Sequence, residues 1–149
     1  MKILTIIGAR PQFIKAVSFS RYLKNSSDIQ EIILHTGQHY DYNMNDKFFS
    51  ELDISIPDYN LGVGSDTPAR QTARMMIGIE DIAFKEKPDF ILIYGDTNST
   101  IAGALAGAKI HIPVIHIEAG LRSYDREMPE EINRVVSDSI STILFILPH

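Results

Sequence analysis

Short runs of apolar residues alternate along this chain with longer segments whose apolar residues recur at helical spacing. This alternation is typical of α/β folds, in which a helix carries the chain back between successive parallel strands. Nearly continuous apolar runs further indicate strands that are covered on both faces. The predicted strands are Ile3–Ile7, Ile32–His35, Phe90–Tyr94, Val114–Glu118 and Ile143–Leu147, with Asp58–Leu61 as a candidate short edge strand.

The segments between these runs predict helices. Proline is favoured at a first helical position, so Pro11 is expected to open a helix that ends near Leu23 and places Phe13, Ala16 and Val17 on the sheet. The other predicted helices are Asn45–Leu52, a long helix from Pro68 to about Lys85 with Thr67 as N-cap, the small-residue helix Asn98–Lys109, and a last helix from Pro129.

Helical spacing also predicts which side chains of the later helices face inward. For the long helix these are Ala69, Ala73, Met76, Ile77, Ala83 and Phe84, and for the last helix Ile132, Val135, Val136 and Ile140.

The predicted fold is therefore α/β: a doubly wound, mostly parallel, Rossmann-like sheet with helices on both faces. The 149 residues fit one domain. Right-handed crossovers bring the carboxyl ends of all strands to one edge, where such folds bind ligands.

Composition excludes several classes of function. The net charge is −5 and like charges form no long run, so neither a nucleic-acid partner nor an anionic membrane surface is expected. The chain has no cysteine, which excludes disulfides and thiolate chemistry and is compatible with a reducing compartment. No apolar stretch approaches the ~20 residues of a membrane span.

Polar, glycine-containing segments follow four of the predicted strands, and we expect them to converge at one edge of the sheet. The segments are Gly8-Ala9-Arg10-Pro11-Gln12 with Lys15, Thr36-Gly37-Gln38-His39, Gly95-Asp96-Thr97-Asn98-Ser99, and Glu118-Ala119-Gly120-Leu121-Arg122-Ser123.

Each segment also has a plainer interpretation. The first could bind an anion through Arg10, Lys15 and free helix N–H groups, or it could be an ordinary strand-to-helix turn. Asp96 alone is adequately explained as a helix N-cap. Glu118 follows a buried strand, which favours a functional carboxylate over an ion pair with Arg122 or Arg134.

Two further acidic positions leave alternatives open. Glu130 and Glu131 lie in a first helical turn, where carboxylates complement the helix dipole, and Arg134 could pair with either. His116 and Glu118 share a strand face, but no third ligand stands at a suggestive spacing, so a hydrogen-bonded core histidine is favoured over a metal ligand.

Five segments, in the same order and at nearly the same spacing, resemble the non-hydrolysing UDP-N-acetylglucosamine 2-epimerase family over essentially the whole chain. They are Gly8–Lys15, Gly37-Gln38-His39, Tyr94-Gly95-Asp96-Thr97, His116–Ser123 and Met128–Arg134.

The resemblance implies that residues 1–149 form the N-terminal Rossmann-like domain of a two-domain, glycosyltransferase-B-like enzyme whose C-terminal UDP-binding domain is absent here. The implied reaction inverts C2 of a UDP-sugar without a metal or organic cofactor, in the cytoplasm, as a homodimer. This chain alone is expected to be inactive. The implied catalytic residues are Asp96, Glu118 and Glu130, and the implied substrate-binding residues are Arg10, Lys15, Gln38, His39 and Arg134.

The first segment departs from the pattern of many members, which have Thr and Glu where this chain has Ala9 and Gln12. That form is similar to the branch that acts on UDP-2,3-diacetamido-2,3-dideoxyglucuronic acid, so two sugars remain candidates. Two other functions also stay open: a non-catalytic module that binds a nucleotide sugar or a protein partner, and the N-terminal domain of a glycosyltransferase.

Overall fold

A computed structural model describes residues 1–39 and 42–146. Six strands form one sheet in the order β3-β2-β1-β4-β5-β6, and every neighbouring pair is parallel. The elements, in chain order, are β1 (Lys2–Ile7), α1 (Arg10–Lys24), β2 (Gln30–His35), α2 (Asp46–Glu51), β3 (Tyr59–Asn60), α3 (Pro68–Glu86), β4 (Phe90–Tyr94), α4 (Asn98–Lys109), β5 (Val114–Ile117), α5 (Pro129–Ile140) and β6 (Ile143–Phe145).

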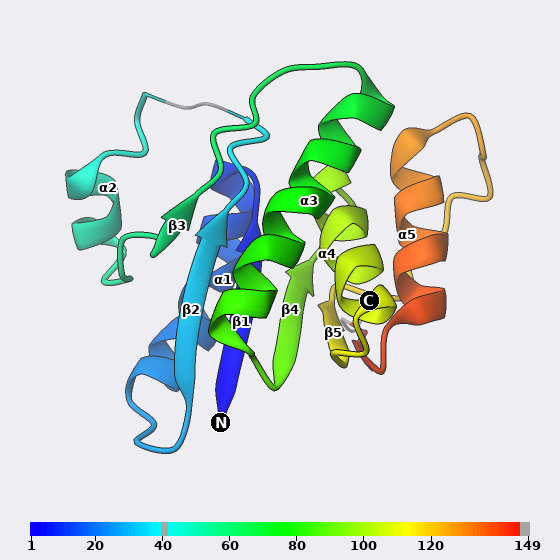
Figure 1. Cartoon of the computed structure of the whole chain (residues 1–149). Coiled ribbons are helices and arrows are strands. Elements are labelled where there is room, and N and C mark those ends of the chain that lie inside the picture. Colours follow the sequence, from blue (N-terminus) through cyan, green and yellow to red (C-terminus); the bar gives the residue numbers. More distant parts are fainter. Residues whose placement is uncertain (40–41, 147–149) are drawn as a thin grey trace.

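The chain winds outward from the middle of the sheet in two directions. From β1 it passes to β2 and β3 on one side, and it then crosses to β4, β5 and β6 on the other (Figure 1). The loops that follow β1 and β4 therefore leave the sheet in opposite directions and open a crevice between the two strands. This is the predicted doubly wound fold.

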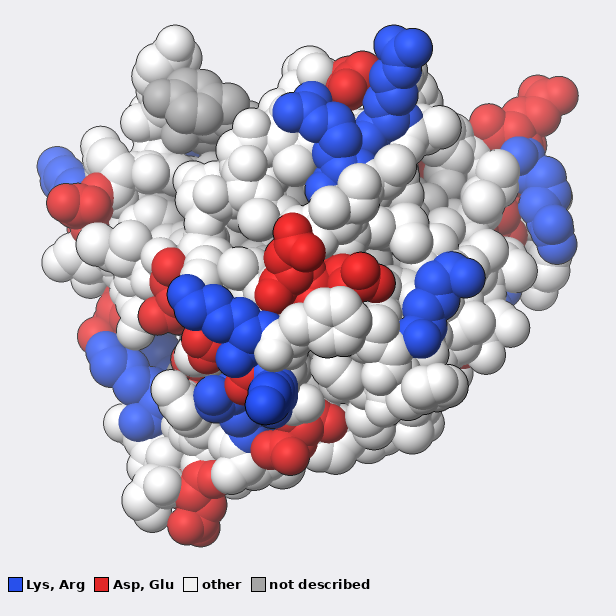
Figure 2. Space-filling view, viewed as in Figure 1, with Lys and Arg blue, Asp and Glu red and all other residues white. Residues whose placement is uncertain are grey.

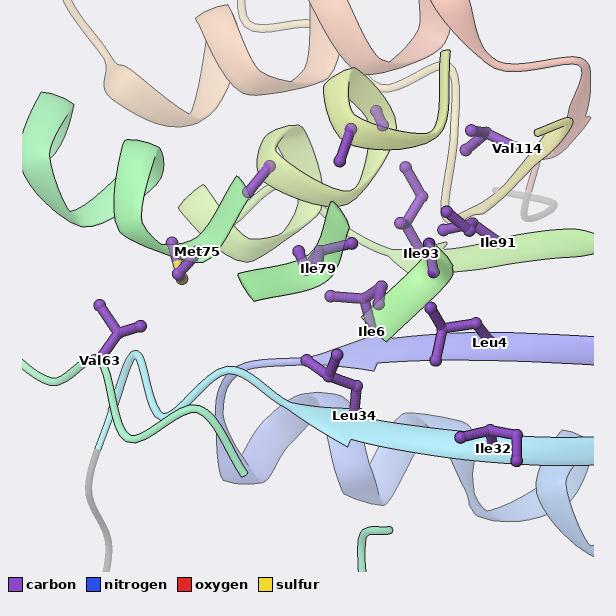
Figure 3. Close-up of a cluster of buried hydrophobic side chains, with 14 residues drawn as sticks. Leu4, Ile6, Ile32, Leu34, Val63, Met75, Ile79, Ile91, Ile93 and Val114 are labelled. Carbon is purple, nitrogen blue, oxygen red and sulfur yellow. The ribbon is translucent and has the colours of Figure 1, made fainter. Parts of the chain in front are cut away.

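Helices cover both faces of the sheet. On one face α3 and α4 pack on the central strands, and Figure 3 shows Met75 and Ile79 of α3 against Ile6 and Leu34 in this core. On the other face α1 and α2 form a second core, in which Phe13 is fully buried beside Phe49.

Helix α4, the predicted small-residue helix, packs closely on the sheet because its small side chains allow it. A Cβ placed on Gly103 would approach Cγ2 of Ile93 to 2.8 Å, which is closer than side chains normally pack. The start of α4 is thereby held against the carboxyl end of β4, where the site lies. A capping box between Thr97 and Thr100 fixes its first turn.

The predicted strands are confirmed within a few residues, and the edge strand is present as β3. Two ends differ. β5 stops at Ile117, and Glu118 lies in a turn with a φ of 66°. β6 ends at Phe145, and Leu147, the predicted end, lies outside the described residues.

The predicted inward faces of two helices are confirmed only in part: Ala83 is buried and Met76 and Ile140 pack against the core, but other predicted positions are exposed. In α3 the buried residues are Gln71, Met75, Ile79 and Ala83, whereas Ile77 and Phe84 are exposed. In α5 Ile132 is 46% exposed, and the buried residues are Glu131, Asn133, Ser137 and Asp138. α5 packs beside α4, and its buried polar residues bond the loops that follow β4 and β5.

Basic and acidic side chains are interspersed over the face shown in Figure 2, which is the face of α3, α4 and α5. No area of one sign dominates that face. Within the described ranges, every helix is too short or too polar to cross a bilayer.

Candidate active site

A cavity of about 410 Å³ opens at the carboxyl edge of the sheet between β1 and β4. Its walls come from the loops after β1, β4 and β5 and from the start of α1, as expected at a topological switch point. The lining residues are Ala9, Arg10, Pro11, Gln12, Lys15, His39, Tyr94, Gly95, Asp96, Thr97 and Glu118.

Asp96 is held by an arginine from α5. Nε of Arg134 donates to Oδ2 of Asp96 at 3.0 Å, and Nη2 of the same guanidinium lies 2.8 Å from that oxygen in an ion pair. Burial disfavours the charged guanidinium, but the hydrogen bonds and charges of Asp96 and Glu131 raise the pKa of Arg134 above its ordinary value. The N-cap explanation for Asp96 is wrong, because Thr97 caps α4.

Glu118 faces the cavity from the opposite loop. Its Oε2 accepts a hydrogen bond from Nζ of Lys15 at 3.0 Å, and its side chain is only 14% exposed. Neither arginine suggested as its structural partner pairs with it, since Arg122 bonds Asp138 and Arg134 bonds Asp96. The positive φ of Glu118 is strained for a residue with a side chain, and such strain is concentrated at functional sites.

Gln12 ties the first loop to the loop after β4. Its Oε1 accepts from the N–H of Gly8 at 2.7 Å, and its Nε2 donates to the carbonyl of Tyr94 at 2.9 Å and to Oγ1 of Thr97 at 3.1 Å. An ionised glutamate at this position could not make the last two donations. The departure from the common family motif therefore has a structural consequence here.

Tyr94 lines the cavity between the two carboxylate loops. It is 1% exposed, and among the described residues its hydroxyl has no hydrogen-bond partner. Burial, followed by the charges of Glu31 and Glu118, raises the pKa of the Tyr94 phenol, which therefore stays neutral.

Of the other predicted binding residues, two line the cavity and one does not. Arg10 and His39 line the cavity, and the guanidinium of Arg10 lies 5.3 Å from the ring centre of Phe48. Gln38 is buried outside the lining, and its Oε1 accepts from both the N–H and the hydroxyl of Ser99. Gln38 thus joins two loops of the wall, and its part in substrate binding stays a prediction.

The two neighbouring glutamates of α5 differ in environment. Glu130 is exposed and outside the cavity lining, one helical turn before Arg134 and hence on the same side of the helix. Glu131 is buried and accepts hydrogen bonds from the N–H groups of Ser123 and Tyr124, both at 3.0 Å. It also pairs with Arg134 at 3.3 Å, as the sequence suggested.

These contacts change the acidity of Glu131. The hydrogen bond from the Ser123 N–H lowers its pKa against the opposing effect of burial, and the Tyr124 N–H and Arg134 lower it further. An ionised Glu131 therefore anchors the loop before α5.

The sequence interpretation missed Asn133 and Asp138. Nδ2 of Asn133 donates to the carbonyl of Asp96 at 2.9 Å. Oδ1 of Asp138 contacts Nδ1 of His116 at 2.7 Å. Both occupy the inward face of α5 that helical spacing assigned to apolar residues, and a polar residue at such a position was the available signal.

In the ranges 1–39 and 42–146, the histidine, aspartate and glutamate side chains form no group of three arranged to hold a metal ion. The arrangement instead offers two carboxylates, each beside a cation, on the walls of one cavity. Such groups can exchange protons with a bound molecule and stabilise positive charge that develops in it.

Comparison with known proteins identifies the family of this chain. The family model described as UDP-N-acetylglucosamine 2-epimerase matches residues 21–148. A "UDP-N-acetylglucosamine 2-epimerase homolog" of Methanococcus maripaludis is 60% identical over 97% of this chain and 40% of its own length. The UDP-2,3-diacetamido-2,3-dideoxy-D-glucuronate 2-epimerase of Pseudomonas aeruginosa is 57% identical over 97% of this chain and 41% of its own.

Among solved structures, the UDP-GlcNAc 2-epimerase of Methanocaldococcus jannaschii, crystallised with UDP-GlcNAc and UDP, matches with a TM-score of 0.93 and 51% identity. The match covers 98% of this chain and 40% of that one. The chain thus spans about two fifths of the length of these relatives. Sequence and fold agree, and the chain belongs to the UDP-N-acetylglucosamine 2-epimerase family.

Proposed function

We propose that this chain forms one wall of the active site of an epimerase that inverts C2 of a UDP-linked 2-acetamido sugar. The observation that carries the proposal is the pair Asp96 and Glu118. They lie in the loops after two different strands, β4 and β5, and line one cavity, each beside its own cation, Arg134 or Lys15. A binding module for an anionic ligand would gain nothing from placing carboxylates there.

The chemistry explains why carboxylates are needed. The C2 hydrogen of the sugar is not adjacent to a carbonyl, so its direct removal is slow. In the proposed route the bond between C1 and the UDP oxygen breaks while a base takes the C2 proton, which gives a glycal and free UDP. UDP then adds back to C1, and a proton returns to C2 from the other face.

Carboxylates serve two needs of this route. They stabilise the positive charge that develops at C1, and they remove and return the C2 proton. We assign these roles to Asp96, Glu118 and Glu130. Glu130, exposed at the start of α5, is assigned on its place in the family motif and on its position one turn before Arg134.

The leaving diphosphate needs cations or helix N-termini. Arg10 and Lys15 on α1 and His39 after β2 supply basic groups around the same cavity. We propose that they contact the UDP-sugar, with Gln38 and Arg134 supporting the loops and carboxylates beside it. The M. jannaschii enzyme was crystallised with UDP-GlcNAc and UDP, which supports a ligand of this class.

The rest of the active site is proposed to lie in a C-terminal UDP-binding domain, because the relatives are about two and a half times as long as the matched region. The chain alone is then expected to lack activity. The sugar is either UDP-N-acetylglucosamine or UDP-2,3-diacetamido-2,3-dideoxyglucuronic acid, since relatives named for each are more than half identical to it.

We further propose that the enzyme is a cytoplasmic homodimer. An apolar groove on α3, α4 and α5 supports self-association, with Met76, Ile101 and Ile132 in its lining. The absence of cysteine is compatible with a reducing compartment.

A chimera tests the proposal. Residues 1–149 are joined to the C-terminal part of the M. jannaschii enzyme, and a second chimera uses that of the P. aeruginosa enzyme. Both are assayed with both sugars, beside the chain alone. We expect epimerisation by at least one chimera, its loss in Asp96→Asn, and unchanged activity in the control Asp81→Asn, an exposed site on α3. UDP-sugar binding without turnover in both chimeras would favour a non-catalytic module.

A further inference from the structure

His116 lies in the middle of the network behind the cavity. It belongs to β5 and is fully buried. Its Nε2 lies 2.7 Å from the carbonyl oxygen of Gly95, and its Nδ1 lies 2.7 Å from Oδ1 of Asp138. The ring therefore bridges the end of β4 and the inward face of α5.

Both partners of the ring are hydrogen-bond acceptors. A carbonyl oxygen can only accept, so Nε2 must carry a hydrogen. Oδ2 of Asp138 accepts from the N–H of Gly120 at 2.9 Å and from Nη1 of Arg122 at 2.6 Å. A guanidinium at that distance favours an ionised carboxylate, which leaves no proton on Asp138 to donate to Nδ1. Both ring nitrogens then carry hydrogen, and the ring is an imidazolium.

His116 and Asp138 together hold the backbone of both carboxylate loops of the site. Gly95 directly precedes Asp96, and Gly120 lies two residues after Glu118. Glu118 has a φ of 66°, a conformation that is costly for a residue with a side chain and that a surrounding network must hold in place. The pair of His116 and Asp138 makes that network, because it bonds the backbone of both loops.

We infer that His116 is a positively charged positioning residue, which together with Asp138 sets the geometry of Asp96 and Glu118. The inference rests on the proposed function for its catalytic consequence. The charge and the contacts of the ring can be tested without any activity.

The first test is nuclear magnetic resonance of the chain labelled with ¹⁵N at histidine, at neutral pH. His116 is assigned by its absence in His116→Gln, with the exposed His111→Asn as the matched control. We expect both ring nitrogens of His116 to show the imidazolium signature with bound hydrogens. Asp138→Asn, which keeps the ring and removes its anion, is expected to convert it to a neutral tautomer. A neutral His116 ring in the unmodified chain would overturn the inference.

The second test measures kcat and KM in the active chimera. His116→Gln is expected to lower kcat by about tenfold to a hundredfold, as displaced catalytic groups do, with little change in KM. Asp138→Asn should act in the same direction, whereas His111→Asn should not. An unchanged kcat in either network variant would contradict a positioning role. If His116→Gln does not fold, Asp138→Asn and the spectrum of the unmodified chain still decide the question.

Inactivity of both chimeras before mutation would count against the proposed function alone. The ring spectrum would still establish or exclude the charged His116. The two failures are therefore distinguishable.

Discussion

Lys15 on α1 and Glu118 after β5 are separated by 103 residues in the chain, yet Nζ and Oε2 lie 3.0 Å apart on the cavity wall. The lysine side chain is 52% exposed and the glutamate side chain 14% exposed. Lys15 is therefore accessible to solvent, whereas Glu118 is largely buried. A charged ligand in the cavity can contact the lysine while the ion pair is kept.

Lys15→Met separates function from stability. Partly exposed ion pairs contribute only about 0–1 kcal/mol, so the free energy of unfolding should change by no more than that. In an active chimera the variant should lose at least about tenfold in kcat/KM, because the substrate phosphates and Glu118 both lose a cation. Denaturant titration and steady-state kinetics check the two parts. An unchanged kcat/KM would remove Lys15 from the site.

Glu131→Gln should weaken the loop before α5 in a pH-dependent way. The pKa of Glu131 is lowered in the folded chain, so its contribution to stability is present above its ordinary value of 4.5 and disappears as pH falls through the folded value. The variant should be less stable than the unmodified chain at neutral pH, and the difference should shrink on acidification. Urea unfolding across that range measures it, and a constant difference would contradict the account.

Glu31 should behave in the opposite way. Burial is the main cause that raises its pKa, even though Thr5 donates a hydrogen bond to it at 2.6 Å. Its contribution is therefore greatest below its ordinary value and is lost as pH rises through the folded value. Glu31→Gln keeps an acceptor for Thr5 and should be at least as stable as the unmodified chain at neutral pH. Lower stability there, by thermal or urea unfolding, would count against this assignment.

Ile132→Glu tests the proposed dimer. The residue is 46% exposed and lines the apolar groove, so a charge there should disfavour association with a second copy. Sedimentation or light scattering should show a dimer for the unmodified chimera and a shift to monomer for the variant. Ile77→Glu, at an exposed site of α3 that is not among the groove residues, is the control. A monomeric unmodified chimera would refute the proposal directly.

Much of the fold could be predicted from local sequence patterns. Buried parallel strands such as Phe90–Tyr94 are continuous apolar runs, and Pro11, Pro68 and Pro129 marked helix starts within a residue. The convergence of the loops after β1, β4 and β5 could also be predicted, because parallel strands all end at one edge.

The inward face of α5 could not be predicted from its apolar residues. Helical spacing assumes that a helix packs on an apolar surface, but α5 buries Glu131 and Asp138, which bond the loop that follows β5. The ion pairs of the site could not be predicted either. Lys15–Glu118 and Asp96–Arg134 each join residues that are far apart in the sequence, so the pairs depend on how the side chains lie in the folded chain. The sequence suggested Arg122 or Arg134 as an ion-pair partner of Glu118, but Glu118 pairs with Lys15.

The central claim, that Asp96 and Glu118 support elimination and re-addition at C2, is tested most directly by isotope exchange. The active chimera is incubated with its sugar in deuterium oxide, and C2 of both epimers is examined by mass spectrometry and NMR. The account predicts deuterium at C2 in the product, a rate lowered by about a hundredfold or more in Asp96→Asn and Glu118→Gln, and no change in Asp81→Asn. Epimerised sugar that retains its original hydrogen at C2, or full exchange in both carboxylate variants, would contradict it.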